Sequence, residues 1–159
     1  MLILLIGSVT LAVCLAIQVL ALVLILRRLK RFFAHRSAGS GILADFGAIC
    51  FVALVAFVGH LLQAGIWAAL FVRLDQFVDF QTAFYHSLVN LSSLGYGDLV
   101  MNEPWRLLGA MEAASGVLLF GVTAGALVAI INAVFSQSSL SRHPARHDES
   151  GHHQDHEHS

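Results

Sequence analysis

The sequence contains Ser92-Ser93-Leu94-Gly95-Tyr96-Gly97-Asp98 directly after a short apolar segment, Phe80 to Leu91. A helix rises about 1.5 Å per residue, and a bilayer span needs about 20 apolar residues. The apolar segment is therefore too short to cross a membrane. We expect a re-entrant or interfacial helix that is followed by a glycine-containing loop.

Three longer apolar stretches surround this short segment, and each is long enough to span a bilayer. They are 1–26, about 47–72 and about 107–135. Hydrophobic residues make up 57% of the 159 residues and charged residues 12%, whereas soluble domains carry about 25% charged residues. The expected fold class is an all-α membrane protein with three transmembrane helices and a re-entrant helix. Residues 1–26 could also be a cleaved signal peptide, but their cations follow the apolar run, which favours a retained helix.

The distribution of Lys and Arg predicts the topology. The cytoplasmic side is expected to hold the cation-rich segments, which are the basic loop 27–42 and the start of the tail at Arg142 and Arg146. The N-terminus then lies outside the cell (inner) membrane and the C-terminus lies in the cytoplasm. The re-entrant segment enters from the outer face. The net charge of −1 gives no indication of a nucleic-acid partner, and no residue cluster suggests an enzyme.

The glycine loop has the composition that a dehydrated cation requires. Such an ion needs oxygen atoms in place of its water shell, and consecutive backbone carbonyls supply them when they face one side. Gly95 and Gly97 can adopt the dihedral angles that this arrangement needs. Ser93 can add a hydroxyl oxygen, and Tyr96 can brace the loop. Irregular backbone at membrane depth is tolerated only where protein or a water-filled cavity surrounds it.

This loop resembles the selectivity filter of potassium channels, Thr-Val-Gly-Tyr-Gly-Asp, with Ser93 in place of Thr and Leu94 in place of Val. The resemblance implies a pore domain over 43–136 with an outer helix, pore helix, filter and inner helix, and it implies permeant K⁺ without a cofactor. The implied ion-binding residues are Ser93, Leu94, Gly95, Tyr96 and Gly97, with Asp98 at the filter mouth.

The resemblance extends to the segments on both sides of the filter. Residues 83–91 look like the pore helix, which Asp79 can cap through the amides of Gln81 or Thr82. Gly116 falls near the position of a gating hinge in the family, although helix packing is the alternative for this glycine. On the same helix, Phe120, Ala124 and Val128 share a face that by analogy lines the inner cavity, and plain packing would produce the same stripe.

Glu112 is an ionisable residue inside the last predicted span. Some members of the family carry a glutamate behind the filter where this chain has Val89. A charged carboxylate at the centre of a membrane helix costs about 2.5–3.5 kcal/mol, so Glu112 needs a partner. Our hypothesis is that it supports the filter through Asn90, Ser92 or Ser93 of the pore loop. A protonated acid that bonds to the helix backbone is the alternative.

Two further groups of polar residues admit alternative interpretations. His60 and Gln63 on the second span could form a proton or metal site, but hydrogen bonds between helices are favoured. The tail, 137–159, is predicted to be disordered. Its histidines could bind a metal ion, and the candidate ligands are His152, His153, His156 and His158.

These expectations combine into a potassium-selective channel. A filter needs four loops around one axis and the chain has one, so the partners are three further copies in a homotetramer, together with membrane lipid. Helix 1–26 would pack on the periphery. The alternatives are a weakly selective monovalent cation channel and a non-conducting sensor or accessory subunit with a metal-binding tail.

Overall fold

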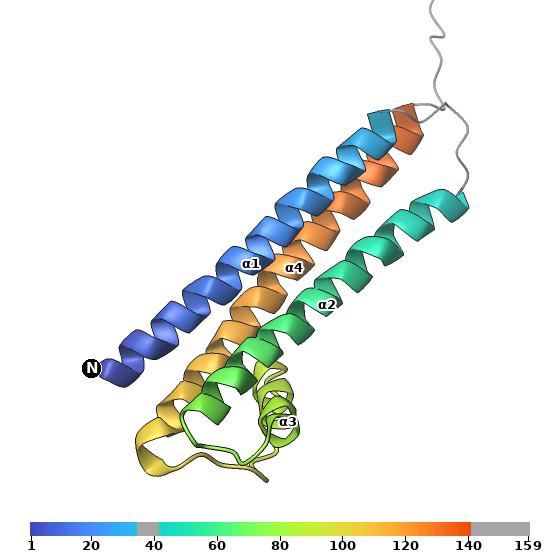
Figure 1. Cartoon of the computed structure of the whole chain (residues 1–159). Coiled ribbons are helices and arrows are strands. Elements are labelled where there is room, and N and C mark those ends of the chain that lie inside the picture. Colours follow the sequence, from blue (N-terminus) through green and yellow to red (C-terminus); the bar gives the residue numbers. More distant parts are fainter. Residues whose placement is uncertain (35–41, 141–159) are drawn as a thin grey trace, which may run out of the picture.

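The computed structural model describes residues 1–34 and 42–140 and is all-helical over these ranges. The helices are α1 (Leu2–Ala34), α2 (Ile42–Arg73), α3 (Phe80–Leu91) and α4 (Arg106–Leu140), and a 3₁₀ turn, η1 (Glu103–Trp105), precedes α4. Figure 1 shows α1, α2 and α4 running alongside one another as long rods, with the short α3 at one end of the bundle. The expected all-α class is confirmed.

Each of the three long helices can cross a membrane. The apolar spans are Leu2–Arg28, Asp45–Arg73 and Glu103–Asn132. α1 has 33 residues and α4 has 35, which gives each helix a length of about 50 Å, longer than a hydrocarbon core of about 30 Å. The chain is an integral membrane protein, and the ends of its helices extend beyond the apolar layer.

Two predicted boundaries differ from the structure. The basic loop was expected over 27–42, but α1 continues to Ala34 and α2 begins at Ile42. Charged residues end a membrane span without ending a helix, because Arg, Lys and Leu are good helix formers. Helix α4 likewise continues to Leu140, into the predicted tail. The rest of that tail, including its four candidate metal ligands, lies outside the described residues.

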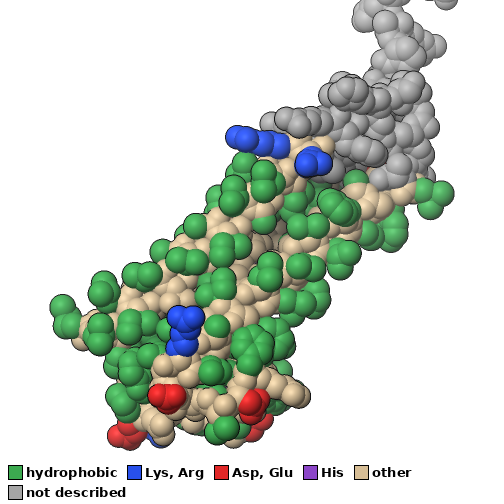
Figure 2. Space-filling model, in the orientation of Figure 1, with side chains coloured by type: hydrophobic (Ala, Val, Ile, Leu, Met, Phe, Trp, Pro, Cys, Tyr) green, Lys and Arg blue, Asp and Glu red, His purple; other side chains and the backbone are tan. Residues whose placement is uncertain are grey.

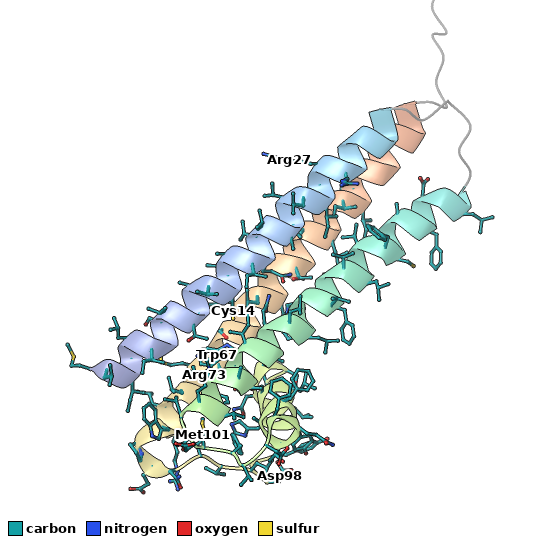
Figure 3. The ribbon with its side chains drawn as sticks, in the orientation of Figure 1. Cys14, Arg27, Trp67, Arg73, Asp98 and Met101 are labelled. Carbon is teal, nitrogen blue, oxygen red and sulfur yellow. The ribbon has the colours of Figure 1, made fainter. Side chains whose placement is uncertain are left out.

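The main core lies at the α3 end of the bundle. Trp67 and Phe71 of α2 pack there with Leu108 and Leu119 of α4, and all four side chains are almost completely buried. Cys14 of α1 belongs to the same cluster, and Figure 3 shows it close to Trp67. Helix α3 is therefore held against α2 and α4 by the densest packing in the described part of the protein.

Acidic side chains gather at the α3 end of the molecule. On the face shown in Figure 2, basic groups are also present near that end, and further basic groups lie at the far end of α1. Figure 3 places Arg27 at that far end and Asp98 beside α3. The loops and the turn at the α3 end carry Asp75, Asp79, Asp98 and Glu103, all of which are exposed.

Candidate functional site

Helix α3 begins at a side-chain cap. Asp79 has an extended backbone, with φ −137° and ψ 159°. Its Oδ1 accepts from the Thr82 amide at 2.8 Å, and its Oδ2 accepts from the Thr82 hydroxyl at 2.8 Å. Donation by the Thr82 amide lowers the pKa of the Asp79 carboxyl from its ordinary value. The predicted cap is present, with Thr82 as the partner that the geometry selects.

Helix α3 ends in a Schellman motif with a serine in the left-handed position. Ser93 has φ +59°. Its amide donates to the Asn90 carbonyl at 2.8 Å, and the Leu94 amide donates to the Val89 carbonyl at 3.0 Å. These are the two hydrogen bonds of that motif, which normally uses glycine because other residues are disfavoured at positive φ. Ser93 therefore stops the helix and begins the loop at the same time.

The loop backbone alternates in handedness along its length. φ is positive at Ser93 (+59°), Gly95 (+59°) and Gly97 (+72°), and it is not positive at Leu94 or Tyr96. Alternation between right- and left-handed dihedrals turns successive peptide planes so that their carbonyls face one side and their amides face the other. Only every second residue needs positive φ, and two of these three are glycines.

Hydrogen bonds fix which side the amides face. The Val89 carbonyl accepts from the amides of Leu94 (3.0 Å) and Gly95 (3.3 Å), and also from the Ser92 hydroxyl (3.1 Å). The amides of Leu94 and Gly95 therefore point back to the end of α3. No group in the described ranges donates a hydrogen bond to the carbonyls of residues 93–97, and the segment 92–98 is exposed in the single chain.

The far end of the loop is tied to α3 by one side-chain hydrogen bond. Tyr85 Oη donates to Asp98 Oδ2 at 2.8 Å. This bond raises the pKa of the Tyr85 phenol above its ordinary value. Asp98 was predicted at the filter mouth, but its pairing with Tyr85 was not predicted. The available signal was an aromatic hydroxyl on the pore helix near an acid that follows the second glycine.

Asn90 joins α3 to the buried Glu112 of α4. Its Nδ2 lies 3.2 Å from Glu112 Oε2 and 2.9 Å from His86 Nε2. Because both bonds use amide hydrogens of Asn90, His86 Nε2 must accept and its proton lies on Nδ1. Of the three partners considered for Glu112, the structure brings Asn90 to it. The Ser92 hydroxyl donates to the Val89 carbonyl instead, and the Ser93 amide donates to the Asn90 carbonyl at the end of α3.

The environment of Glu112 is closed to solvent within one chain. The side chain is fully buried, and Glu112 Oε1 and the Ser87 hydroxyl have no hydrogen-bond partner among the described residues. The Ser115 hydroxyl donates to the Glu112 backbone carbonyl at 2.7 Å, within the same helix. The Asn90 bond thus links this carboxyl to α3, and the carboxyl also interacts electrostatically with the Ser87 side chain of the same helix.

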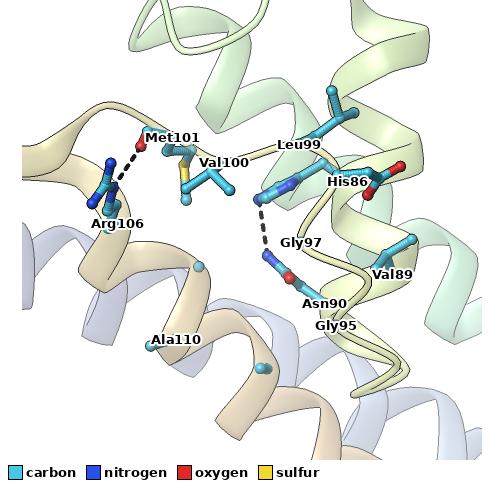
Figure 4. A pocket seen from close by; sticks show the side chains of 13 residues that line it. His86, Val89, Asn90, Gly95, Gly97, Leu99, Val100, Met101, Arg106 and Ala110 are labelled. Atoms are coloured by element: carbon cyan, nitrogen blue, oxygen red, sulfur yellow. Dashed lines mark hydrogen bonds between the residues drawn. The ribbon is translucent and has the colours of Figure 1, made fainter.

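A cavity of about 280 Å³ lies between the loop and α4 (Figure 4). Asn90, Gly95 and Gly97 line one side of it, and small residues of α4 line the other, at Gly109, Ala110 and Ala113. Arg106 Nε donates to the Met101 carbonyl at 3.1 Å at its edge. The small α4 residues leave room behind the loop for it to shift.

Gly116 lies where α4 supports the end of α3. A Cβ atom at this position would overlap the carbonyl of Leu91. By contrast, a Cβ atom at Gly121 or Gly125 would meet nothing within 4 Å in the single chain. The structure thus gives Gly116 a packing role, and the hinge role remains a prediction.

The three predicted cavity-lining residues are all exposed along α4. Phe120 also stacks on His60 of α2, with ring centroids 4.2 Å apart. Its ring therefore contacts α2 as well as the open side of α4.

Comparison with known protein families agrees with this geometry. A family model described as "Ion channel", of the two-transmembrane, potassium-channel type, matches residues 48–133, just over half of the chain. The chain belongs to this ion channel family. The match begins in α2 and ends in α4 of the channel, so all of α1 precedes it. Neither the curated proteins nor the solved structures gave a match.

Proposed function

We propose that this ion channel is a potassium-selective homotetramer, with the backbone of residues 93–97 as its filter. The observation that carries the proposal is the alternating positive φ at Ser93, Gly95 and Gly97. Together with the hydrogen bonds to the Val89 carbonyl, it leaves a row of carbonyls without donors and facing away from α3. Rings of such carbonyls replace the hydration shell of K⁺ in selectivity filters.

The exposure of the loop supports assembly of several copies. Leu94 is 55% exposed and Tyr96 is 66% exposed in the single chain. Irregular backbone with free carbonyls cannot face lipid, so other copies must surround it. Four loops around one axis complete a filter, and the exposed face of α4 with Phe120, Ala124 and Val128 would then line the cavity below it.

The charges at the α3 end support cation conduction. Four exposed acids lie in the loops and the turn at this end, and they would concentrate cations at the outer mouth. The ions would lose water at Asp98 and Gly97 and pass in single file to Ser93. Repulsion between neighbouring ions would keep each site weak enough for exit. The basic end of α1 would lie in the cytoplasm, with the N-terminus outside.

Two contacts would hold the filter in this geometry. The Tyr85–Asp98 hydrogen bond supports its outer end, and the Asn90–Glu112 bond supports the pore helix from behind. The first bond joins the end of the loop to α3, and the second joins α3 to α4. Together they would oppose collapse of the loop into the cavity beside it.

Potassium flux into liposomes that contain the purified full-length protein tests the proposal. We expect barium-blockable K⁺ flux and a reversal potential near the K⁺ equilibrium value in mixed K⁺ and Na⁺. Gly95→Ala should abolish flux because φ is +59° there, whereas Gly47→Ala, whose Cβ atom meets nothing within 4 Å, should not. Absence of flux from a verified tetramer would contradict the proposal.

The same experiment tests the weakly selective alternative. Ser93 and Leu94 depart from the usual filter residues, and both lie at its inner end. A reversal potential close to zero in equal and opposite K⁺ and Na⁺ gradients would favour a monovalent cation channel. In that case conduction would stand and potassium selectivity would be wrong.

A further inference from the structure

Gln18 of α1 lies in a buried polar cluster that connects the three long helices. Its Oε1 accepts from Gln63 Nε2 of α2 at 2.7 Å, and its Nε2 donates to Thr123 Oγ1 of α4 at 2.8 Å. His60 Nε2 of α2 lies 3.2 Å from the same Thr123 oxygen. All four side chains are buried. One side chain of α1 therefore contacts both helices of the family domain.

This is a specific contact within an otherwise apolar helix. In the described part of α1, no other side chain hydrogen-bonds to another helix, since the Thr10 hydroxyl donates to Ile6 of its own helix at 2.9 Å. Gly59 makes room for Gln18, because a Cβ atom there would lie 2.8 Å from Gln18 Oε1. Hydrogen bonds between polar side chains stabilise the association of membrane helices, and a polar side chain without a partner there is energetically costly.

The cluster contacts the segment of α4 that we propose to line the cavity. Thr123 directly precedes Ala124 and lies one helical turn from Phe120. His60, which reaches Thr123, also stacks on the ring of Phe120. A shift of Gln18 would therefore be transmitted to the two residues that would narrow or widen the cavity.

Two polar atoms of the cluster lack a hydrogen bond in this arrangement. His60 Nδ1 and Gln63 Oε1 are buried without a hydrogen-bond partner in the described ranges. Buried polar atoms without partners are uncommon in native proteins and call for a reason. The two side chains lie three residues apart on α2 and interact with each other, so a movement of α4 would change the contacts of Thr123 with Gln18 and His60.

We propose that α1 is a regulatory helix of this channel and that Gln18 is a positioning residue that sets the balance between two arrangements of α4 through Thr123. The inference rests on the proposed function, since α4 must line the pore for its position to alter conduction. It gives a role to the helix that lies wholly outside the family match.

Single-channel recording of the full-length protein in planar bilayers with symmetric KCl tests this role. Gln18→Leu and Thr123→Val each remove the bond, and each should change the ratio of open to closed time in the same direction. We expect a change of about 3-fold to about 20-fold, which corresponds to ~0.6–1.7 kcal/mol for hydrogen bonds between membrane helices. The two effects should be less than additive in the double variant, because the single variants share the loss of the Gln18–Thr123 bond, while each also loses a contact of its own, to Gln63 or to His60.

Two variants serve as matched controls. Thr123→Ser keeps the hydroxyl and should retain the wild-type ratio. Thr10→Val removes a hydroxyl of α1 that contacts no other helix, and it should also leave the ratio unchanged. Gln18→Asn, which shortens the side chain, replaces Gln18→Leu if the latter does not assemble. Conductance and reversal potential should match the wild type throughout.

Several results would overturn the inference. A wild-type ratio in both single variants, with normal conductance, would show that α1 does not act through this bond. Fully additive effects in the double variant would also contradict the inference. A lower melting temperature of the tetramer without any change in gating would show that the bond is purely structural. A wild-type protein that does not conduct would refute the proposed function, and this inference with it.

Discussion

Asn90 of the pore helix α3 bonds to Glu112 of α4 across the back of the loop, with 3.2 Å between Nδ2 and Oε2. The same amide reaches His86 at 2.9 Å, so a chain of three polar side chains runs from α3 to the second turn of α4. The bond connects residues 22 positions apart in the sequence. It places a carboxyl of α4 behind the loop that we propose as the filter, where residue 89 of this chain is a valine.

Replacement of Glu112 should weaken the tetramer and relax its selectivity. Glu112→Leu leaves a buried donor of Asn90 unpaired, which costs about 1–3 kcal/mol. We expect a lower melting temperature of the tetramer and a smaller shift of reversal potential between K⁺ and Na⁺. Glu112→Gln keeps an acceptor and should show a smaller effect of the same sign. Ser115→Ala, which removes a bond within α4, is the control, and wild-type behaviour of both Glu112 variants would refute a supporting role.

Gly116→Ala should separate α3 from α4. The added Cβ atom would overlap the Leu91 carbonyl, and overpacking of this kind costs about 1–3 kcal/mol. Tetramer yield after size-exclusion chromatography should fall, and K⁺ flux should fall with it. Gly121→Ala adds the same methyl group in open space and should be neutral or stabilising. A stable Gly116→Ala tetramer with altered open time would instead favour the hinge role.

Tyr85→Phe should destabilise the outer end of the filter while leaving the fold intact. The variant loses the 2.8 Å bond to Asp98, and we expect less sustained K⁺ flux at neutral pH. In the wild type the pKa of Tyr85 is raised above its ordinary value of about 10, so the bond is present across neutral pH and is lost as pH rises through that raised pKa. Flux measured against alkaline pH should therefore decline in the wild type and decline less in Tyr85→Phe. Equal profiles would exclude this role.

Asp79→Ala should lower the thermal stability of the tetramer by removing both bonds to Thr82. Asp79→Asn retains an acceptor oxygen and should lie between this variant and the wild type. The pKa of Asp79 is lowered by the Thr82 amide, so the cap contributes fully above the ordinary carboxyl pKa and is lost as pH falls through the lowered value. Melting curves from neutral to acidic pH measure this loss. Asp75→Asn in the preceding loop is the control, and a melting curve of Asp79→Ala like that of the control would contradict the assignment.

The lengths of the apolar runs predicted most of the architecture. The number of consecutive apolar residues predicts the three spans and the short helix. Asp79 is recognisable as a cap because an acid directly before a helix can accept from the free amides of its first turn, such as that of Thr82. The end of α1 was missed because hydropathy marks where a helix leaves lipid and does not mark where its hydrogen bonds stop. Ala34, rather than the first arginine, is the last helical residue.

The contacts between elements could be predicted only in part. Asn90–Glu112 was among the expected pairs because a buried acid needs a partner. Gln18 and Thr123 are 105 residues apart, and α1 is apolar almost all round, so no periodicity indicates which face meets α4. Tyr85 and Asp98 meet because of the left-handed stop at Ser93, which the sequence does not reveal, since serine seldom adopts that conformation.

The orientation of the filter depends on one oxygen atom of the main chain, the Val89 carbonyl, which receives the amides of Leu94 and Gly95. A peptide oxygen is present whatever side chain the codon specifies. A substitution at Val89 would therefore change the packing of a buried side chain and still leave in place the oxygen atom that orients the loop.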